Sequence, residues 1–401
     1  MSNVSFMEKL LGGVEVEWKP LGEVGEFIRG NGLQKKDFIE TGFPAIHYGQ
    51  IYTKYGLSAD ETFTYVSEEL AKKLRKANRN DLLLATTSEN DEDVVKPLAW
   101  LGRQAAISGD MMLFRHEQNV KYLAHYFLTE AFQAQKRKYI SGAKVRRVSS
   151  GDLAKIIVPI PCPENPKKSL EIQSEIVRIL DTFTELTTEL TTELAARKKQ
   201  YNYYRDQLLS FEEGEVEWKT LGDLAENLDS MRKPVTSGLR EAGEIPYYGA
   251  SGIVDYVKDY IFDGDFLLVS EDGANLLARN TPIAFSVCGK SWVNNHAHIL
   301  KFNTYAERRY VEYYLNSIDL TPYISGAAQP KLNQKNLNSI KIPNPSPEEK
   351  ARIVAILDKF DALTSSITEG LPREIELRQK QYEYYRDLLL SFPKSEVKGA
   401  A

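Results

Sequence analysis

Several features are scarce in this 401-residue chain, and each scarcity excludes a class of protein. Cys162 and Cys288 are its only cysteines and lie far apart, without Cys-x-x-Cys or zinc spacing, so we expect two reduced thiols and no disulfide framework. No apolar stretch approaches the length of a membrane span, and the N-terminus lacks the basic start and apolar run of a signal peptide. We therefore expect a cytoplasmic protein.

Catalytic motifs are scarce as well. The chain has no G-x-x-x-x-G-K-[ST] phosphate loop, no convincing G-x-G-x-x-G after a strand, and no nucleophile in a known family signature. His296 and His298 suggest a metal site, but no cysteine or carboxylate is placed beside them, and we expect both on one strand face, where packing or DNA contact is favoured. Amino-methyltransferases use an Asp/Asn-Pro-Pro-aromatic loop, and residues 344–347, Asn-Pro-Ser-Pro, do not match it after Pro345. These absences favour a binding protein.

Positive charge is in short supply overall, since the formal net charge is −5, whereas nucleic-acid-binding proteins usually show a basic footprint. One segment differs. Residues 131–150 contain no Asp or Glu and carry a local charge of +6. Its cations are Lys136, Arg137, Lys138, Lys144, Arg146 and Arg147. Net charge therefore does not decide whether the chain binds nucleic acid.

A tandem duplication is the most informative feature that is present. The string EVEWK at residues 15–19 recurs at residues 215–219. Three further strings recur in the same order: ISGA, IVxILD and QYxYYRD, at residues 140–143, 176–181 and 200–206 and again at 324–327, 353–358 and 381–387. The period is far too long for a solenoid, so a whole module is duplicated. A protein with two related halves usually meets a two-part target.

The two ends of the chain also resemble one another. Residues 393–397 echo the sequence that follows Phe211, and residues 10–15 resemble the exit from the first helical repeat. Each end thus carries part of one junction, as in a ring that has been cut. We expect the ends to lie close together.

Each copy of the repeat contains a long amphipathic helical segment. Apolar residues at 172–190 alternate in steps of four and three, which is the a/d seam of a coiled coil, and the second copy repeats this at 353–367 and 382–389. Gly-Leu-Pro at 370–372 predicts a kink or break in the second segment. The seams could pack on their own domains or on each other. We favour an antiparallel pair that serves as a rigid spacer.

Two divergent blocks share one frame around these helices. Each begins with WKxLG and ends in an apolar strand closed by prolines, over about residues 21–161 and 221–345. Strand-like runs alternate with turns, and one helix precedes each closing loop, around residues 120–134 and 308–318. We expect mixed α+β domains with a sheet core. A common scaffold with divergent surfaces suits modules that recognise two different things.

The loops that close the two blocks align without gaps at a displacement of 184 positions, 140–149 against 324–333. Small residues, cations and amides in these loops suit contacts with phosphates and base edges. A solvated surface loop with chance basic residues is the alternative, and we favour nucleic-acid contact. The candidate residues are Lys144, Arg146, Arg147 and Ser149 in the first loop and Gln329, Lys331 and Asn333 in the second.

Aromatic and amide residues form a second cluster in each block. Side chains around glycine at residues 47–55 and 247–252 could stack on bases, although tyrosine in a strand is as often half-buried packing. Residues 270–275 could bind cytosine or form a turn, and we favour the turn. The remaining DNA-contact candidates are Tyr48, Gln50, Tyr52, Lys54, Tyr248, Ser251, Asn295 and His296.

With its two divergent domains and the repeated IVxILDxF and QYxYYRDxLLSF strings, the chain resembles the DNA-specificity subunit of a Type I restriction–modification enzyme. Thr-x-Glu-Leu units at residues 184–194 resemble the IC subclass. GAAQPKL at 326–332 and the block at 247–254 also resemble target-recognition domains, whereas the first domain departs from this loop pattern at 144–147.

This resemblance implies an α+β fold. Two α/β target-recognition domains would be separated by two long repeated helices, which pair as an antiparallel coiled coil in a pseudo-two-fold circular arrangement. The expected parts are an N-terminal arm (1–20), the first recognition domain (21–161), a central helix (165–213), the second recognition domain (214–345), a C-terminal helix (346–392) and a tail (393–401).

The resemblance also implies partners and a target. One such subunit assembles with two methyltransferase subunits, which use S-adenosylmethionine to methylate adenine N6, and with two ATP-dependent motor-nuclease subunits. The DNA site would be bipartite and asymmetric. This chain would hold no cofactor or metal of its own and would not be catalytic, while S-adenosylmethionine, ATP and Mg²⁺ would bind to the partners. The alternative is a coiled-coil scaffold that binds proteins, and a free-standing nuclease has little support.

Overall fold

The computed structural model describes residues 13–212, 214–326, 329–366 and 368–392. The chain divides into two compact units, each described by itself below. Unit 1 comprises Met1–Leu190 and Ile375–Ala401, and unit 2 comprises Thr191–Glu374. The expected closeness of the chain ends concerns residues 1–12 and 393–401, which lie outside the described residues, as does residue 367 of the second seam.

Unit 1 is built on two sheets. The larger one has the strand order β2 (Gly25–Arg29), β11 (Met111–His116), β7 (Leu82–Ala85), β9 (Lys96–Trp100) and β4 (Ser58–Ala59). The smaller one has the order β5 (Thr64–Val66), β3 (Phe43–Ile46), β10 (Ala105–Ile107) and β6 (Lys76–Ala77). Every residue of β7 is buried, because this central strand is covered on both faces. Two short pairs join β1 (Val16–Pro20) to β13 (Ile157–Pro161) and β8 (Thr87–Ser88) to β12 (Arg146–Arg147).

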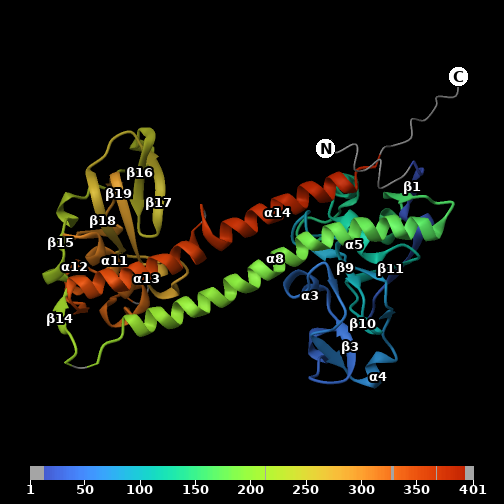
Figure 1. Cartoon of the computed structure of the whole chain (residues 1–401), viewed down its shortest axis with the longest axis horizontal. Coiled ribbons are helices and arrows are strands. Elements are labelled where there is room, and N and C mark those ends of the chain that lie inside the picture. The colour runs from blue at the N-terminus through green and yellow to red at the C-terminus, as the bar shows by residue number, and fades with distance from the viewer. Residues whose placement is uncertain (1–12, 213, 327–328, 367, 393–401) are drawn as a thin grey trace. The chain divides into compact units, whose positions relative to one another are not determined.

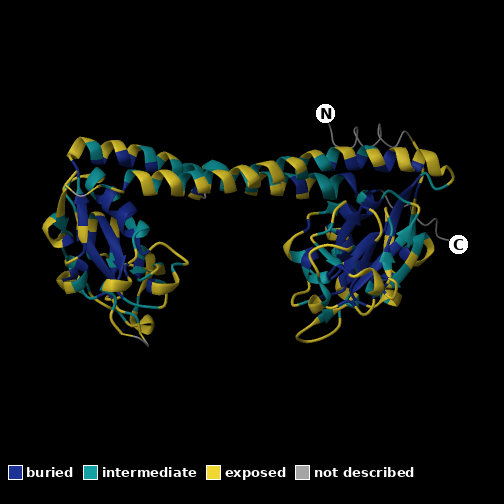
Figure 2. Cartoon of the chain, turned by 90° about the horizontal axis from the view of Figure 1, so that it is seen from below, coloured by how far each residue is buried: buried dark blue, intermediate teal, exposed yellow. Residues whose placement is uncertain are grey.

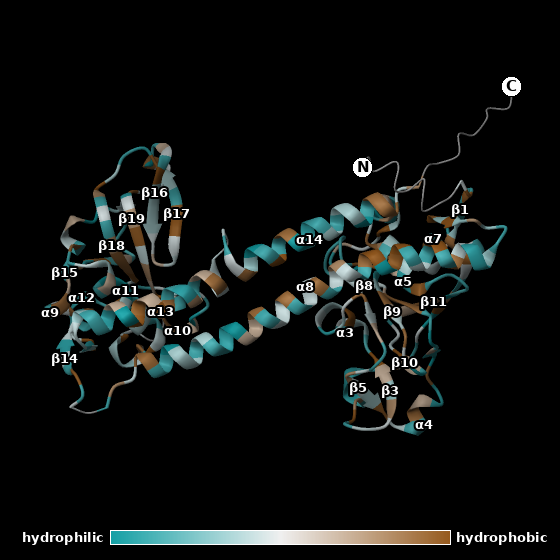
Figure 3. Cartoon of the chain, in the orientation of Figure 1, coloured by the Kyte–Doolittle hydropathy of each residue, from teal (hydrophilic) through white to brown (hydrophobic). Residues whose placement is uncertain are grey.

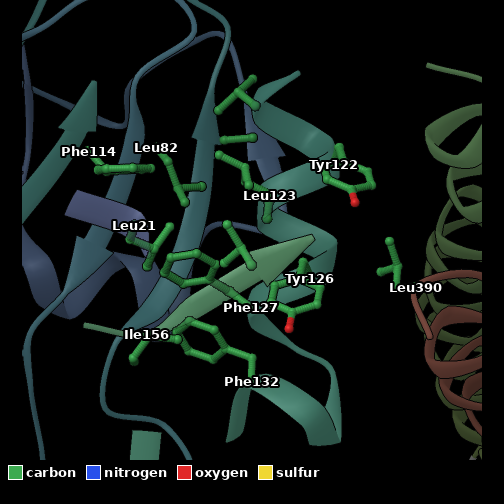
Figure 4. Close-up of a cluster of buried hydrophobic side chains, with 14 of the residues drawn as sticks. Leu21, Leu82, Phe114, Tyr122, Leu123, Tyr126, Phe127, Phe132, Ile156 and Leu390 are labelled. Carbon is green, nitrogen blue, oxygen red and sulfur yellow. The ribbon is translucent and has the colours of Figure 1, made fainter. Parts of the chain in front are cut away.

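Helices cover one face of the larger sheet. Figure 4 shows side chains of α5 (Val120–Phe127), among them Leu123 and Phe127, packed with Leu82 and Phe114 of the sheet in one buried cluster. The expectation of a single helix over residues 120–134 is wrong, because α6 (Glu130–Lys136) begins anew: the hydroxyl of Thr129 accepts a hydrogen bond from its first turn. The shorter helices are α2 (Leu21–Val24), α3 (Tyr48–Thr53), α4 (Glu68–Ala71) and α7 (Ser150–Leu153).

Unit 2 contains one six-stranded sheet. Its order is β15 (Glu226–Asn227), β20 (Ala297–Lys301), β18 (Phe262–Ser270), β19 (Ala284–Val293), β16 (Ala242–Gly249) and β17 (Gly252–Val257). A separate pair joins β14 (Glu217–Thr220) to β21 (Lys341–Asn344). The helices of this domain are α9 (Leu221–Leu224), α10 (Asn275–Ala278), α11 (Tyr305–Ser317) and α12 (Gln334–Asn338). In both units the strands form the buried interior (Figure 2).

The shared frame predicted from the duplication is confirmed. The two apolar closing strands are each paired antiparallel with the strand of the repeated EVEWK string, so that Trp18 lies opposite Pro159 and Trp218 lies opposite Pro343. Both domains are mixed α+β structures with a sheet core, as expected. Their sheets nevertheless differ in strand number and order, which matches the divergence of the two blocks in sequence.

The repeated helices are α8 (Pro166–Leu208), α13 (Pro347–Ser365) and α14 (Gly370–Leu389). Apolar residues recur at intervals along α8 (Figure 3). The predicted break in the second copy is confirmed, since α13 ends before residue 366 and α14 begins at Gly370. Gly370 has φ +78°, and a Cβ atom there would lie 2.3 Å from the carbonyl oxygen of Ala362. Only glycine fits this turn without strain.

The heptad seams divide their packing between the two arrangements considered. In unit 1, Ile172 and Ile176 of α8 are buried in the core of their own domain, whereas Phe183 stacks on Tyr385 of α14 at 5.3 Å between ring centroids. Within this unit α8 and α14 run in opposite directions (Figure 1). Packing onto the domain and antiparallel pairing therefore each hold for part of the seam.

Unit 2 pairs its helical segments in the same way. There Tyr204 of α8 stacks on Phe360 of α13, with ring centroids 5.8 Å apart. Over the described part of the chain, no helix is long and apolar enough to cross a membrane. Cys162 and Cys288 are both free thiols, as predicted.

Candidate nucleic-acid interface

The two closing loops have the same backbone geometry. Ser141 and Arg147 exchange two backbone hydrogen bonds of 2.9 Å, and at matched positions Ser325 and Lys331 exchange two of 2.8 Å. The glycines that follow the serines have φ +93° and +83°, and a Cβ atom on either would come within 2.5 Å or less of a carbonyl oxygen across the turn. The glycine of the repeated string therefore takes the same left-handed conformation in both copies, at positions 142 and 326. Residues 327 and 328 of the second loop lie outside the described part.

Ser149 and Asn333 anchor the ends of these loops. The Ser149 hydroxyl accepts a hydrogen bond of 3.1 Å from the backbone N–H of Asp152 and caps α7. Asn333 Oδ1 accepts one of 2.9 Å from the N–H of Asn336 and caps α12. Both predicted contact residues are thus N-caps, a role that serine and asparagine favour. The residue before each cap is buried, so the loop is fixed at its exit.

In unit 1 the first loop borders a surface cleft of about 510 Å³. The cleft brings two predicted clusters together, because Tyr48 and Tyr52 line it with Val145 of the closing loop. Residues 48–53 form α3, so these aromatic side chains come from a helix. The alternative in which the tyrosines pack within a strand is therefore wrong for this block. Burial raises the pKa of Tyr52, whose hydroxyl donates a 2.9 Å hydrogen bond to the Thr87 carbonyl.

Gln50 and Lys54 belong to the same segment but do not line the cleft. Gln50 is buried, and its Oε1 accepts a 2.9 Å hydrogen bond from the N–H of His47, which completes the cap of α3. Lys54 Nζ lies 5.4 Å from the centre of the Phe63 ring. Gln50 therefore has a structural role, and Lys54 faces a different surface.

The basic segment at residues 131–150 provides fewer surface cations than its sequence indicates. Lys136 is buried, and its ammonium donates 2.9 Å hydrogen bonds to the carbonyl oxygens of Glu92 and Val94. Burial lowers the pKa of this lysine to about 8. Arg137 pairs with Glu130. Neither cation is available in full for a phosphate.

Three cations remain beside the cleft in the first closing loop. Arg146 forms a 2.8 Å ion pair with Asp91. Arg147 and Lys144 are exposed, and neither forms an ion pair with an acidic side chain among the residues that the structure describes. An exposed and unpaired cation is the form that suits phosphate contact, because its charge is not already offset.

In unit 2 backbone hydrogen bonds connect the second loop with the turns that follow β18 and β19. The N–H of Asn294 donates to the Tyr248 carbonyl at 3.1 Å, and the N–H of Glu271 donates to the His296 carbonyl at 2.9 Å. The N–H of Gly273 then donates to the Pro330 carbonyl at 3.2 Å. These bonds gather one set of predicted contacts at a single end of the domain. The set is Tyr248, Ser251, Asn295, His296, Gln329 and Lys331.

The two histidines do not share a strand face, so that expectation is wrong. A turn ends at His296, and β20 begins only at Ala297. His296 is exposed, with Nδ1 2.9 Å from Asp272 Oδ2, whereas His298 is buried. Its Nδ1 lies 2.6 Å from Asp229 Oδ2. Carboxylates distant in sequence therefore stand beside both rings. The favoured turn after β18 is confirmed.

Three residues that could bind a metal ion meet beneath this loop. One atom each of Asp229, Glu271 and His298 lies within 4.8 Å of the others. Cationic side chains already occupy the carboxylate of Glu271, since Arg232 donates to it at 2.7 Å and Lys331 Nζ lies at 3.0 Å. Burial raises the pKa of Glu271, but hydrogen bonds from these two cations outweigh it and lower the pKa. The geometry favours an ion-pair network over a metal site.

Some residues at these sites were not predicted from sequence. Thr87, Ser88 and Asn90 line the first cleft, and their signal is the polar run that directly follows the buried strand β7. Arg232 has no such signal, because its partner Glu271 lies 39 positions away and the pairing depends on the tertiary fold.

Comparisons with known proteins agree with this geometry. The family model described as Type I restriction modification DNA specificity domain matches the chain twice, at residues 13–197 and 213–377. The chain belongs to this family of Type I restriction–modification specificity subunits. The alternative of a scaffold without DNA specificity is not favoured.

Individual relatives cover nearly the whole chain. The EcoR124I/EcoR124II specificity subunit of Escherichia coli is 39% identical over 429 residues, covering 99% of both chains. The EcoprrI specificity subunit of the same organism is 36% identical over 382 residues, covering 92% of this chain and 93% of its own. The crystal structure of a Type I system S subunit from M. genitalium has a TM-score of 0.59 at 14% identity, over 95% of this chain and 98% of that one, and supports the fold alone.

Proposed function

We propose that this chain selects the DNA site of a Type I restriction–modification complex, and that each recognition domain reads one half of a bipartite, asymmetric site. The observation that carries this proposal is the matched pair of closing loops. The pairs Ser141–Arg147 and Ser325–Lys331 close the two loops with the same backbone hydrogen bonds, while the loops carry different side chains. Two loops closed by the same hydrogen bonds but carrying different side chains suit a protein that binds two different half-sites in the same orientation.

The first domain offers positioning and reading groups side by side. Arg147 and Lys144 are the exposed cations for backbone phosphates, which fix register and orientation. The cleft beside them presents Tyr48 and Ser88, whose hydroxyl groups can hydrogen-bond to base edges. The second domain offers amide and hydroxyl groups at its gathered turns, among them Ser251, Asn295 and Gln329.

The repeated helices would supply two equivalent docking surfaces for two methyltransferase subunits. Tyr203 of α8 and Tyr384 of α14 hold the same position in the QYxYYRD string and are 62% and 58% exposed. Each packs edge-on against the next tyrosine, at 5.4 and 5.3 Å between ring centroids. Exposed aromatic residues are enriched at protein interfaces. Two copies of one partner require two copies of one surface, which the duplication provides.

Catalysis would belong to the partner subunits. S-adenosylmethionine would serve adenine N6 methylation in the two methyltransferase subunits, and ATP and Mg²⁺ would serve translocation and cleavage in two motor-nuclease subunits. In this scheme the chain holds no cofactor or metal and works in the cytoplasm, where the chromosomal DNA lies. Its own contribution is the choice of site and the spacing of the half-sites.

Methylation mapping at single-base resolution tests the proposal. The chain would be coexpressed with its neighbouring methyltransferase in a host that lacks adenine methylation. We expect a gapped motif with one modified adenine in each half. Replacing residues 221–345 with the second domain of a relative should change one half alone. An ungapped motif, or a change in both halves, would contradict the two-domain scheme.

An absence of methylation would need a second measurement to separate an inactive methyltransferase from an incorrect function. The purified complex would be titrated with duplex DNA at several salt concentrations. Binding that weakens steeply with salt supports the DNA-reading function. A stable complex without such binding would restore the protein-binding scaffold.

A further inference from the structure

The two closing loops place a cation at the same position in opposite electrostatic settings. Arg147 of the first loop is exposed and has no acidic partner within the part of the chain that the structure describes. Lys331, its counterpart 184 positions later, has Nζ 3.0 Å from Glu271 Oε1. The matched cations therefore differ in charge balance, although their backbones are alike.

Glu271 is fixed from the interior side. Its side chain is 11% exposed, and its second oxygen accepts a 2.7 Å hydrogen bond from Arg232. Arg232 is 12% exposed and also donates to the Ala297 carbonyl at 2.7 Å. A backbone hydrogen bond also ties the loop to this residue, since the N–H of Leu332 donates to the Glu271 backbone carbonyl at 2.7 Å. Glu271 thus has little freedom to leave Lys331.

His298 supports the same loop from below. Its Nε2 donates to the carbonyl oxygen of Leu332 at 2.7 Å, and its Nδ1 lies 2.6 Å from Asp229 Oδ2. The side chain of His298 is 1% exposed. The residue that follows Lys331 is therefore held by a buried ring, while the side chain of Lys331 remains 51% exposed.

This arrangement disfavours phosphate contact by Lys331. A carboxylate 3.0 Å from the ammonium offsets its charge and would repel an approaching phosphate. The ammonium still has three N–H donors, of which the carboxylate uses only part. Because the carboxylate offsets the charge of Lys331 and fixes the direction of its ammonium, the remaining N–H donors suit a hydrogen-bond acceptor at a defined position better than a diffuse negative charge. In the major groove guanine presents two such acceptors, O6 and N7, on one edge.

We propose that Lys331 is a specificity-determining residue that contacts a guanine in the half-site of the second domain, that Glu271 is its positioning residue, and that Arg147 contacts a phosphate. This inference rests on the proposed function and assigns different roles to two equivalent positions. Glu271 makes Lys331 selective by suppressing its attraction to any phosphate.

Three substitutions test the inference in the complex with the methyltransferase subunit. Arg147→Gln, Lys331→Gln and Glu271→Gln each change one side chain without adding bulk. Affinity would be measured against salt concentration on a duplex that carries the mapped site, and on duplexes in which each base pair of the second half-site is replaced. Glu241→Gln is the matched control, because it breaks the exposed 2.9 Å pair with Lys258 at the other end of the β16–β17 hairpin.

The expected results differ for each variant. Arg147→Gln should lower the salt slope by about 0.9, as for one lost phosphate contact, with every duplex weakened equally. Lys331→Gln should leave the slope nearly unchanged and remove about tenfold discrimination at one guanine. Glu271→Gln should raise the slope by about 0.9 and strengthen binding to nonspecific duplexes, because it releases Lys331 as a free cation. A purely structural role for Glu271 would weaken all binding instead.

Several outcomes would overturn the inference. One is that Lys331→Gln lowers the salt slope by about 0.9 and weakens binding to every duplex equally. Another is that a folded Glu271→Gln variant leaves the salt slope unchanged. A third is that the mapped second half-site contains no G·C pair. If Glu271→Gln does not fold, Lys331→Gln decides alone, since Lys331 is a surface residue. Failure of the proposed function is distinguishable, because the unsubstituted complex would then show no sequence preference at all.

Discussion

His125 and Arg309 occupy equivalent positions in the two copies, and each faces the aspartate that ends the repeated IVxILD string. His125 Nε2 lies 3.4 Å from Asp181 Oδ1 in unit 1. Arg309 Nε donates to Asp358 Oδ1 at 3.1 Å in unit 2. The joint between a recognition domain and its repeated helix is thus built at one place with two different chemistries.

A second position strengthens each joint. Lys121 Nζ lies 2.6 Å from Asp181, and at the matched position the Tyr305 hydroxyl donates to Asp358 at 2.7 Å. Burial raises the pKa of Asp181, but hydrogen bonds from His125 and Lys121 outweigh burial and lower it. Asp181 therefore stays ionised and holds two side chains of α5.

We expect Asp181→Asn to destabilise unit 1 by about 1–3 kcal/mol, because the substitution leaves the partly buried Lys121 without its charge partner. Urea unfolding followed by tryptophan fluorescence would measure the change. Glu130→Gln is the control within unit 1, since Glu130 is 67% exposed and pairs with the exposed Arg137. Equal effects of the two substitutions would show that Asp181 does not hold the domain.

Histidine protonation should make unit 1 less stable at acidic pH. Burial lowers the pKa of His116 to about 4 and also lowers the pKa of His125. The unfolded chain then binds more protons than the folded chain between about pH 4 and pH 6.5, so stability rises with pH across this window and is lost as pH falls through it. His116 alone should contribute roughly 2 kcal/mol of loss between pH 7 and pH 5.

Urea midpoints at pH 5 and pH 7 would measure this loss, and His116→Gln should flatten the dependence. A wild-type midpoint that does not change over this range would contradict the prediction. Unit 2 provides an internal comparison, because Arg309 replaces His125 at its joint.

The left-handed turn of the first closing loop should tolerate no side chain. Gly142→Ala would place a Cβ atom 2.1 Å from the Val145 carbonyl oxygen at φ +93°. We expect a local cost of about 1–3 kcal/mol and loss of discrimination in the first half-site only. Gly151→Ala is the matched control, since its Cβ would meet nothing nearer than 3.9 Å. Equal methylation patterns for the two variants would separate the loop from DNA reading.

The exposed tyrosines should decide how many methyltransferase subunits bind. Tyr203→Ala should remove one copy and the double variant with Tyr384→Ala should remove both, because each tyrosine belongs to one of two equivalent surfaces. Native mass spectrometry of the coexpressed complex would count the copies. Retention of two copies by the double variant would place the docking surface elsewhere.

Much of the fold follows from the duplication itself. Once ISGA is aligned with its second copy, the matched hairpins and the N-caps at Ser149 and Asn333 are local consequences of sequence. The break before Gly370 is also local, because glycine and proline restrict the backbone wherever they stand. The sequence could therefore predict where the closing loops lie.

Long-range partners were beyond a sequence-based prediction. Lys136 appeared as a surface cation, but carbonyl oxygens of residues 92 and 94 enclose its ammonium. Gln50 appeared as a base-contacting amide, but Thr64 and the cap of α3 use both ends of its side chain. Glu271 and Arg232 meet only through the tertiary fold, where Arg232 donates both to Glu271 and to the carbonyl of Ala297 at the start of β20. The sequence shows which charged residues are present, but only the fold shows which of them are already paired.

The length of α8 should set the gap between the half-sites. This helix is continuous over 43 residues and carries the Thr-Thr-Glu-Leu units before Leu194. Inserting one more such unit after Leu194 would lengthen it by about 6 Å at ~1.5 Å per residue. Because the recognition surfaces are untouched, the half-sites should stay the same while the nonspecific spacer grows. Methylation mapping of the variant would show this directly. New half-sites with the old spacer would mean that the length of α8 does not set the spacing. If the insertion rotates the second domain so that the complex becomes inactive, the variant would bind DNA without methylating it.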